Sequence, residues 1–71
     1  MNSGTGAEGM GLRLRRVANR LSQDEVARAA GVSRGTISRS EQLAWVPERL
    51  ARRHRDAVDK AVAVRRSGGA R

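Results

Sequence analysis

Apolar positions spaced by three and four residues divide the chain into helical segments. Between Met10 and Leu21, apolar residues recur at this spacing with arginines between them, which predicts an amphipathic first helix. We expect the apolar stripe to face the core and Leu12 to pack at its edge. The stripe consists of Met10, Leu14, Val17, Ala18 and Leu21.

A second helix is predicted from Gln23 to Ala30 by signals at both of its ends. Ser22 suits the N-cap, and Glu25 three residues later completes a capping box. Gly31 suits the left-handed conformation in which many helices end. The apolar positions expected in the core here are Val26, Ala27, Ala30 and Val32.

A third short helix follows the N-cap residue Ser33 and runs to about Glu41. Ile37 is its only plainly apolar residue, so the helix has one core anchor and an outer face of short polar side chains and arginine. Such a face favours contact with a partner. The next segment, 42–46, is apolar but too short for periodicity to decide its structure, and we interpret it as a buried loop.

Pro47 suits the first turn of a further helix, and apolar residues continue at helical spacing beyond it. The pattern allows one helix over 47–66 or two helices that separate near His54. His54 lies on the apolar face, where packing is favoured over metal binding because no second ligand stands at a helical spacing.

The predicted fold class is all-α, a compact bundle of four to five short helices that contains a helix-turn-helix. The folded domain is expected over residues 10–66. Glycine-rich segments at 1–9 and 67–71 have too little apolar mass to offset the entropy of ordering, and we expect them to be flexible tails. Trp45 is the only aromatic residue, which also favours helix packing over a sheet.

The charge balance points to a polyanionic partner. Fourteen arginines and one lysine oppose seven acidic residues, which gives a formal net charge of +8 on 71 residues. Arginine suits bidentate contacts with phosphate or guanine. The absence of cysteine excludes disulfides and thiolate metal sites, and no apolar run approaches the roughly 20 residues that span a bilayer.

The sequence offers too few chemical groups for an enzyme. It has one histidine, no cysteine and no paired carboxylates beyond Asp24 and Glu25, so we predict no catalytic residue, cofactor or metal site. Gly4, Gly6 and Gly9 spell a G-x-G-x-x-G pattern, but no strand can precede Gly4, and the dinucleotide fingerprint works only between a strand and a helix.

The densest pattern is Leu-Ser-Gln-Asp-Glu-Val-Ala-Arg-Ala-Ala-Gly-Val-Ser-Arg-Gly-Thr-Ile-Ser-Arg-Ser-Glu, from Leu21 to Glu41. With its flanks, from about Leu12 to Pro47, it resembles the lambda-repressor-like helix-turn-helix family, the Xre and Cro type of bacterial and phage regulators. Two positions depart from the family pattern. Ser40 stands where the family usually has an apolar residue, and Leu43 stands where many members have a helix-ending glycine, so we expect an unusual exit from the third helix.

The resemblance implies that the helix beginning near Ser33 enters the major groove of double-stranded DNA. Its base-facing positions would include arginines able to contact guanine, its hydroxyls would hold phosphates, and Gln23 would anchor the preceding helix to the sugar-phosphate backbone. Arg16 and Glu41 match a partly buried ion pair seen in several members of the family. The DNA-binding residues implied are Gln23 and Ser33, Arg34, Gly35, Thr36, Ser38 and Arg39.

Together these expectations describe a cytoplasmic, nucleoid-associated transcriptional regulator from a bacterium or phage, of the repressor type, that binds DNA sequence-specifically. A homodimer is expected, at least on DNA, because one recognition helix buries too little surface for tight binding. Two alternatives remain open. One is an antitoxin-type DNA-binding protein with a protein partner, and the other is a largely sequence-independent nucleic-acid-binding protein that uses the arginine-rich last helix.

Overall fold

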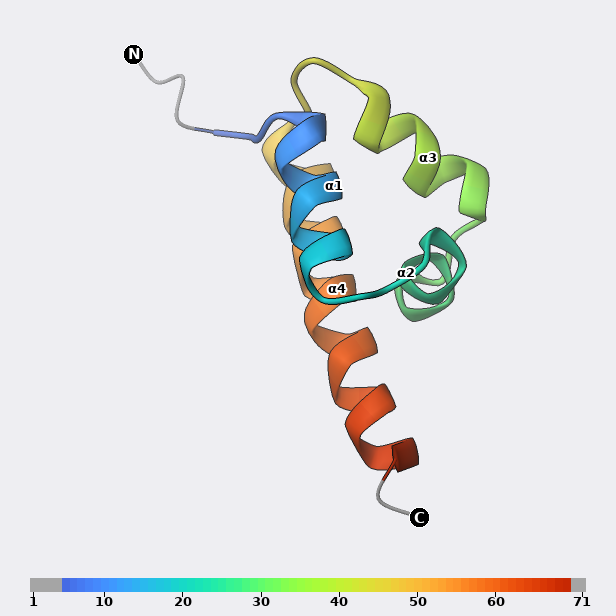
Figure 1. The fold of residues 1–71 in the computed structure, drawn as a ribbon. Coiled ribbons are helices and arrows are strands. Elements are labelled where there is room, and N and C mark those ends of the chain that lie inside the picture. Colours follow the sequence, from blue (N-terminus) through green and yellow to red (C-terminus); the bar gives the residue numbers. More distant parts are fainter. Residues whose placement is uncertain (1–4, 70–71) are drawn as a thin grey trace.

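A computed structural model describes residues 5–69, and within this range the regular structure is helical (Figure 1). Its elements are α1 (Gly9–Ala18), α2 (Gln23–Ala30), α3 (Arg34–Gln42) and α4 (Glu48–Gly69). Helices α2 and α3 form a helix-turn-helix, and α4 runs behind α1 in this view and packs against α1 and α2. The all-α prediction with a helix-turn-helix is confirmed. No helix in this range combines the length and the apolar character needed to cross a membrane.

The helix-turn-helix begins and turns where the capping residues predict. The Ser22 hydroxyl accepts a hydrogen bond from the Glu25 backbone N–H at 3.0 Å, and the Glu25 carboxylate accepts one from the Ser22 N–H at 2.7 Å. These bonds satisfy donors that the first turn would leave unpaired. Gly31 ends α2 with φ 73° and ψ 30°, the left-handed conformation.

The main core lies where α2 and α3 pack against the middle of α4. Val26 and Ile37 are buried there, which confirms them as core residues, and Val32 is half-buried beside them. Helix α4 is continuous over Glu48–Gly69, so the choice between one and two helices is settled in favour of one. The buried members of this core are Leu21, Val26, Ala27, Ile37, Ala57, Val58 and Ala61.

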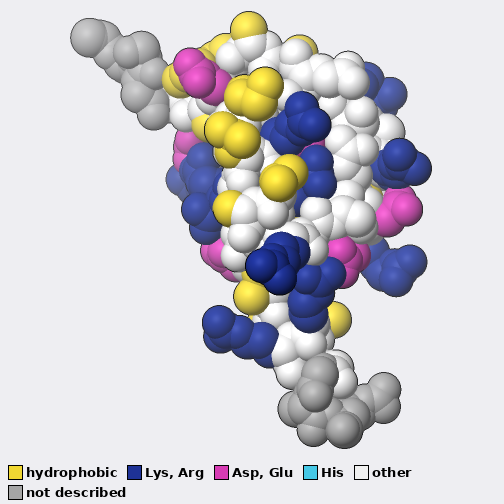
Figure 2. Space-filling model, in the orientation of Figure 1, with side chains coloured by type: hydrophobic (Ala, Val, Ile, Leu, Met, Phe, Trp, Pro, Cys, Tyr) yellow, Lys and Arg dark blue, Asp and Glu magenta, His cyan; other side chains and the backbone are white. Residues whose placement is uncertain are grey.

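Helix α1 is rotated away from the predicted orientation, so the expectation of a buried stripe along it is wrong. Met10, Leu14 and Val17 are 54%, 59% and 50% exposed, while Leu12 and Arg16 are buried. Figure 2 shows hydrophobic side chains gathered over α1 on this outer face. The reason is the Arg16–Glu41 ion pair, which turns the Arg16 side of α1 toward α3 and carries Leu12, one turn earlier, into a second small core.

The loop from α3 to α4 was expected to be buried, and this is wrong for most of it. Leu43 and Trp45 are about half exposed, whereas Val46 is fully buried with Leu12 and Ala51. The backbone of Val46 forms an isolated antiparallel bridge with Ala7, with hydrogen bonds of 3.0 Å and 2.6 Å. The loop is therefore held in place by backbone pairing while two of its apolar side chains face outward.

The same contacts bring residues 7–9 into the fold, in contrast to the tail expected over 1–9. The Gly9 N–H donates to the Leu43 carbonyl at 3.0 Å, and Ala7 is half-buried against the second core. At the other end, α4 continues to Gly69, past the predicted boundary at residue 66. Residues 1–4 and 70–71 of the predicted tails lie outside the described range.

Candidate nucleic-acid interface

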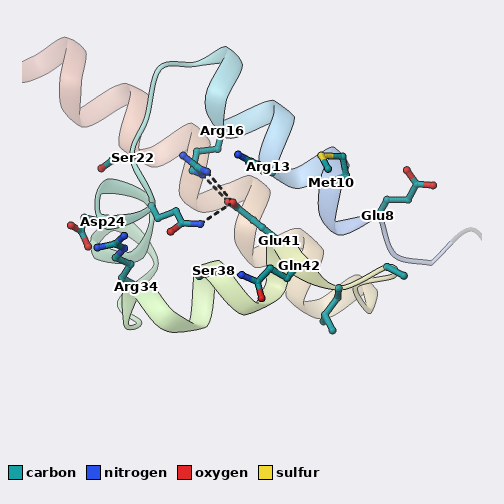
Figure 3. Close-up of a pocket in the computed structure, with 13 residues that line it drawn as sticks. Glu8, Met10, Arg13, Arg16, Ser22, Asp24, Arg34, Ser38, Glu41 and Gln42 are labelled. Atoms are coloured by element: carbon teal, nitrogen blue, oxygen red, sulfur yellow. Dashed lines mark hydrogen bonds and ion pairs between the residues drawn. The ribbon is translucent and has the colours of Figure 1, made fainter.

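A groove opens between α1, the first turn of α2 and the length of α3 (Figure 3). Its walls come from three helices that meet around one buried ion pair, Arg16 with Glu41, at its floor. The lining residues are Glu8, Met10, Arg13, Arg16, Ser22, Gln23, Asp24, Arg34, Ser38, Glu41, Gln42, Leu43 and Ala44.

Helix α3 is fixed by two buried side chains, so its opposite side is free for contact. Ile37 sits in the main core and Glu41 in the groove floor, one helical turn apart. Arg34, Ser38 and Gln42 then follow one another along the groove at successive turns. Helix α3 has the dimensions of an element that the major groove of B-DNA, about 12 Å wide, can admit.

Three of the seven predicted DNA-binding residues, Gln23, Arg34 and Ser38, line this groove. The other four lie on α3 or its cap outside the groove lining. Gly35 and Arg39 are exposed on the outer face of the helix. The hydroxyls of Ser33 and Thr36 are 3.0 Å apart, and the Ser33 hydroxyl also accepts the Thr36 backbone N–H at 3.2 Å. Ser33 therefore has a capping role whether or not it meets a phosphate.

Gln42 and Arg13 are among the groove residues that were not predicted, and the sequence held a usable signal for each. Gln42 stands four residues after Ser38 and eight after Arg34, so helical periodicity alone places it on their side. Arg13 stands one turn before Arg16 and shares the side of α1 that faces α3. Neither was predicted, because the resemblance implies DNA contact only for Gln23 and for positions between 33 and 39.

The exit of α3 differs from the family pattern at the two positions expected. The Ser40 hydroxyl donates to the Thr36 carbonyl at 3.0 Å, so a side-chain hydrogen bond replaces an apolar contact. Leu43 ends the helix in an extended conformation, with φ −73° and ψ 142°, and requires no glycine.

The floor of the groove is a fully formed bidentate ion pair, as the resemblance implied. Arg16 Nε and Nη2 donate to the two oxygens of Glu41 at 2.8 Å and 3.0 Å, and Arg16 Nη1 donates to the Leu21 carbonyl at 2.8 Å. Gln23 Nε2 also donates to Glu41 Oε1 at 3.2 Å. Through these bonds, residues of α1, α2 and α3 are connected within the lining of the groove.

A fourth helix joins this ion pair through His54, which sequence analysis interpreted as a packing residue. His54 is 2% exposed, as packing requires, and its Nε2 lies 2.8 Å from Glu41 Oε2. Burial raises the pKa of Glu41, but the hydrogen bonds from Arg16, His54 and Gln23 outweigh burial, so this pKa lies below its ordinary value. No local spacing relates His54 to Glu41, and only the packing of α4 brings them together.

The groove itself is not a strongly basic surface. Arg16 and Glu41 neutralise each other, and Arg13 and Arg34 are balanced by Glu8 and Asp24. Much of the positive charge is on α4, where seven arginines and lysines stand against three acidic residues. The net positive charge therefore lies outside the lining of this groove, much of it on α4.

The fold and the groove define a helix-turn-helix protein whose second helix presents an exposed polar face. Residues 12–42 match the family described as helix-turn-helix, and this segment is a helix-turn-helix of the Xre and lambda-repressor-like type, a family of DNA-binding regulators. The match ends with α3, so α4 lies outside it. Comparison with curated proteins gave no match, and neither did comparison with solved structures.

Proposed function

We propose that this protein is a sequence-specific DNA-binding transcriptional regulator that reads the major groove with α3 and acts as a repressor. The observation that carries the proposal is the division of α3 into two sides. Ile37 and Glu41 fix one side in the protein, and the other presents Arg34, Gly35 and Arg39 without any core role. Repression needs only occupancy of a site, which a single helix-turn-helix unit can supply.

The residues divide into two roles in this proposal. Arg34 and Arg39 contact base edges, because a guanidinium can donate two hydrogen bonds to guanine. Gly35 lets the backbone approach closely, and Ser38 lies between the arginines on the same side. Gln23 contacts the DNA backbone at the N-terminus of α2, where the helix dipole favours a phosphate.

The direct test is selection of bound duplexes from a random DNA pool, followed by titration of the enriched site. We expect an enriched motif with guanine at two or more positions. Recovery of unenriched sequence at every round would contradict sequence-specific binding and favour the sequence-independent alternative.

Substitution of Arg39 then tests whether α3 reads bases. Arg39→Ala should lose affinity for the selected site by about 10-fold to 100-fold while changing affinity for random DNA much less. Gln23→Ala is the matched control, because loss of a backbone contact should weaken both duplexes alike. Equal losses on both duplexes for Arg39→Ala would remove base reading from α3.

We also infer that two copies pair on DNA through the outer face of α1. Met10, Leu14 and Val17 form a row of half-exposed apolar side chains there, and the half-exposed loop residue Leu43 lines the same groove as Met10. Figure 2 shows hydrophobic side chains gathered on this face. A stable interface buries roughly 800 Å² and about 20 to 30 residues on each partner, so these few side chains alone are too few for one. Two copies of charge +8 also repel each other. Pairing is therefore expected on DNA, where phosphates offset the charge, and weak or absent without DNA.

Sedimentation with and without the selected duplex tests the pairing. Leu14→Glu should leave the monomer folded and shift the complex from two copies per duplex to one, since Leu14 is 59% exposed. Val64→Glu is the matched control, because Val64 is 62% exposed on α4 and lies outside the proposed seam. A wild-type complex of one copy per duplex would contradict the inference, and a second protein that co-purifies in fixed ratio would favour the antitoxin alternative.

A further inference from the structure

Four helices share one buried hydrogen-bond cluster, and the cluster ends at the surface in a single predicted DNA contact. Arg16 from α1, Gln23 from α2 and His54 from α4 all donate to the Glu41 carboxylate of α3. The side chains of Arg16, Glu41 and His54 are at most one-tenth exposed. Gln23 is half-buried and lines the groove, so it is the member able to meet a ligand.

The chemistry of Glu41 fixes the direction of every hydrogen bond in the cluster. Glu41 is ionised near neutral pH because its pKa lies below the ordinary value, and an ionised carboxylate can only accept. The proton on His54 that faces Glu41 therefore lies on Nε2. His54 Nδ1 is buried and has no hydrogen-bond partner among residues 5–69, so Glu41 is the polar contact that holds the ring.

The same charge sets the orientation of the Gln23 amide. With its NH₂ group toward the carboxylate, Gln23 keeps one further N–H to donate, and a phosphate oxygen in the groove is a suitable acceptor. The opposite orientation would place the amide oxygen against a carboxylate oxygen and is excluded by repulsion. The position of Glu41 thus decides what Gln23 can offer to DNA.

His54 shares Oε2 of Glu41 with Arg16, while Gln23 is held by Oε1. Loss of the His54 donor leaves Oε2 with Arg16 as its one remaining partner, and the carboxylate can then shift together with the Arg16 guanidinium, which still holds both of its oxygens. Such a shift moves Oε1, which is the atom that orients Gln23. We propose that His54 is a positioning residue for DNA binding, acting from α4 through Glu41 on the backbone contact made by Gln23.

This inference rests on the proposed function in one respect only, that Gln23 contacts DNA. The test is a double-mutant cycle with His54→Leu and Gln23→Ala, in which binding to a mixed-sequence 20-base-pair duplex is measured at low salt. Mixed sequence suffices because a phosphate contact does not depend on base identity. His54→Leu should weaken binding on the order of threefold to tenfold, as expected for one hydrogen bond in a network, and should have no further effect once Gln23 is alanine.

His54→Gln is the conservative variant, because its side-chain amide can still donate to Glu41. It should restore binding to within about twofold of the wild type. Thermal melts set the working temperature at which all variants are folded. An equal loss from His54→Leu in both Gln23 backgrounds would show a general structural role and overturn the proposal.

A second readout does not require DNA. In ¹H–¹⁵N spectra of the free protein, His54→Leu should shift the side-chain NH₂ signals of Gln23, while those of Gln42, which bonds to Ser38 outside the cluster, stay in place. Unchanged Gln23 signals would overturn the proposal. Failure of the wild type to bind any duplex would instead overturn the proposed function, and the spectra would still report on the cluster.

Discussion

Gly9 lies where the start of α1 touches the end of α3 backbone to backbone. A methyl group at this position would meet the Leu43 carbonyl oxygen and would lie 2.7 Å from the carbonyl oxygens of Ser40 and Glu41. Backbone atoms cannot move aside as a flexible side chain can. Gly9 is thus required for the close approach of the two helices. The sequence did not predict this role, because Gly9 follows a glycine-rich segment that was expected to be a flexible tail.

Gly9→Ala should therefore destabilise the fold by about 1–3 kcal/mol, the usual range for overpacking. Chemical denaturation followed by circular dichroism measures this change. Gly11→Ala is the matched control two residues later in the same helix, where a methyl group meets nothing within 4 Å. It should stabilise α1 by about 0.5–1 kcal/mol through helix propensity. Equal effects of both substitutions would contradict the close contact at Gly9.

At the scale of whole elements, the sequence predicted helix ends better than helix orientation. The capping box at Ser22 and the turn at Gly31 each depend on residues no more than four positions away in the sequence. Local chemistry therefore determines both ends of α2. The rotation of α1 depends on Arg16 reaching Glu41, which is 25 residues away. Residues so far apart in the sequence produce no periodic pattern that would reveal their ion pair. The apolar residues of α1 therefore predicted that the opposite side of the helix faces the core.

The residues of the candidate site also differ in how well the sequence predicts them. The outer side of α3 follows from the single apolar anchor Ile37 and from helical periodicity, so Arg34, Gly35 and Arg39 could be placed without a structure. The place of Arg13 in the groove wall and the hydrogen bond from His54 to Glu41 could not be predicted, because both depend on how α1 and α4 pack. The residues that support the surface from behind are determined by tertiary packing, which the sequence does not show. The residues on the surface itself follow from the local helical pattern.

Helix α3 carries a glycine that helix propensity disfavours, which allows stability and binding to be separated. A methyl group at Gly35 would make only ordinary contacts, 3.6 Å from Arg39 and 3.8 Å from Ser33. Gly35→Ala should therefore stabilise the protein by about 0.5–1 kcal/mol. It should also weaken DNA binding, because the methyl group stands on the face proposed to approach the bases. Thermal melts measure the change in stability, and titration of the selected duplex measures the change in affinity. Tighter binding by the alanine variant would contradict close approach at Gly35.

At the scale of the whole molecule, the Glu41 cluster predicts how the fold responds to acid. The pKa of Glu41 in the folded state is below its ordinary value of about 4.3, so ionised Glu41 stabilises the fold fully above that value. This contribution is lost as the pH falls through the lower pKa of the native state. The melting temperature should therefore decline as the pH falls from about 5 to 3.

Glu25 provides the control for this prediction. Its pKa is also lowered, first by the backbone hydrogen bond from Ser22 and further by Arg65, but Glu25 lies nearer to solvent than Glu41. Glu25→Gln should keep most of the acid-induced decline, because the buried cluster with Arg16 and His54 remains. If that variant lost the pH dependence entirely, the Glu41 cluster would contribute nothing to it.

The charge of α4 bears on whether the protein reads sequence or simply binds nucleic acid. Arg49 and Arg53 are exposed and line a groove between α4 and the C-terminal end of α2, away from the groove that α3 lines. Cations in that position would attract any duplex without contacting the base edges that α3 is proposed to read. The double variant Arg49→Gln, Arg53→Gln should therefore weaken binding to the selected site and to random DNA by the same factor.

Titrations of both duplexes at several salt concentrations measure this effect. The salt slope should fall by less than about 0.9 for each arginine, since that value marks a neutralised phosphate. Arg39→Ala provides the contrast, because it should lower the ratio of the affinity for the selected site to the affinity for random DNA. A fall of this ratio in the α4 variant would indicate that α4 also contacts base edges. If the α4 variant abolished all binding while Arg39→Ala left the ratio unchanged, α4 would be the binding element and the sequence-independent alternative would hold.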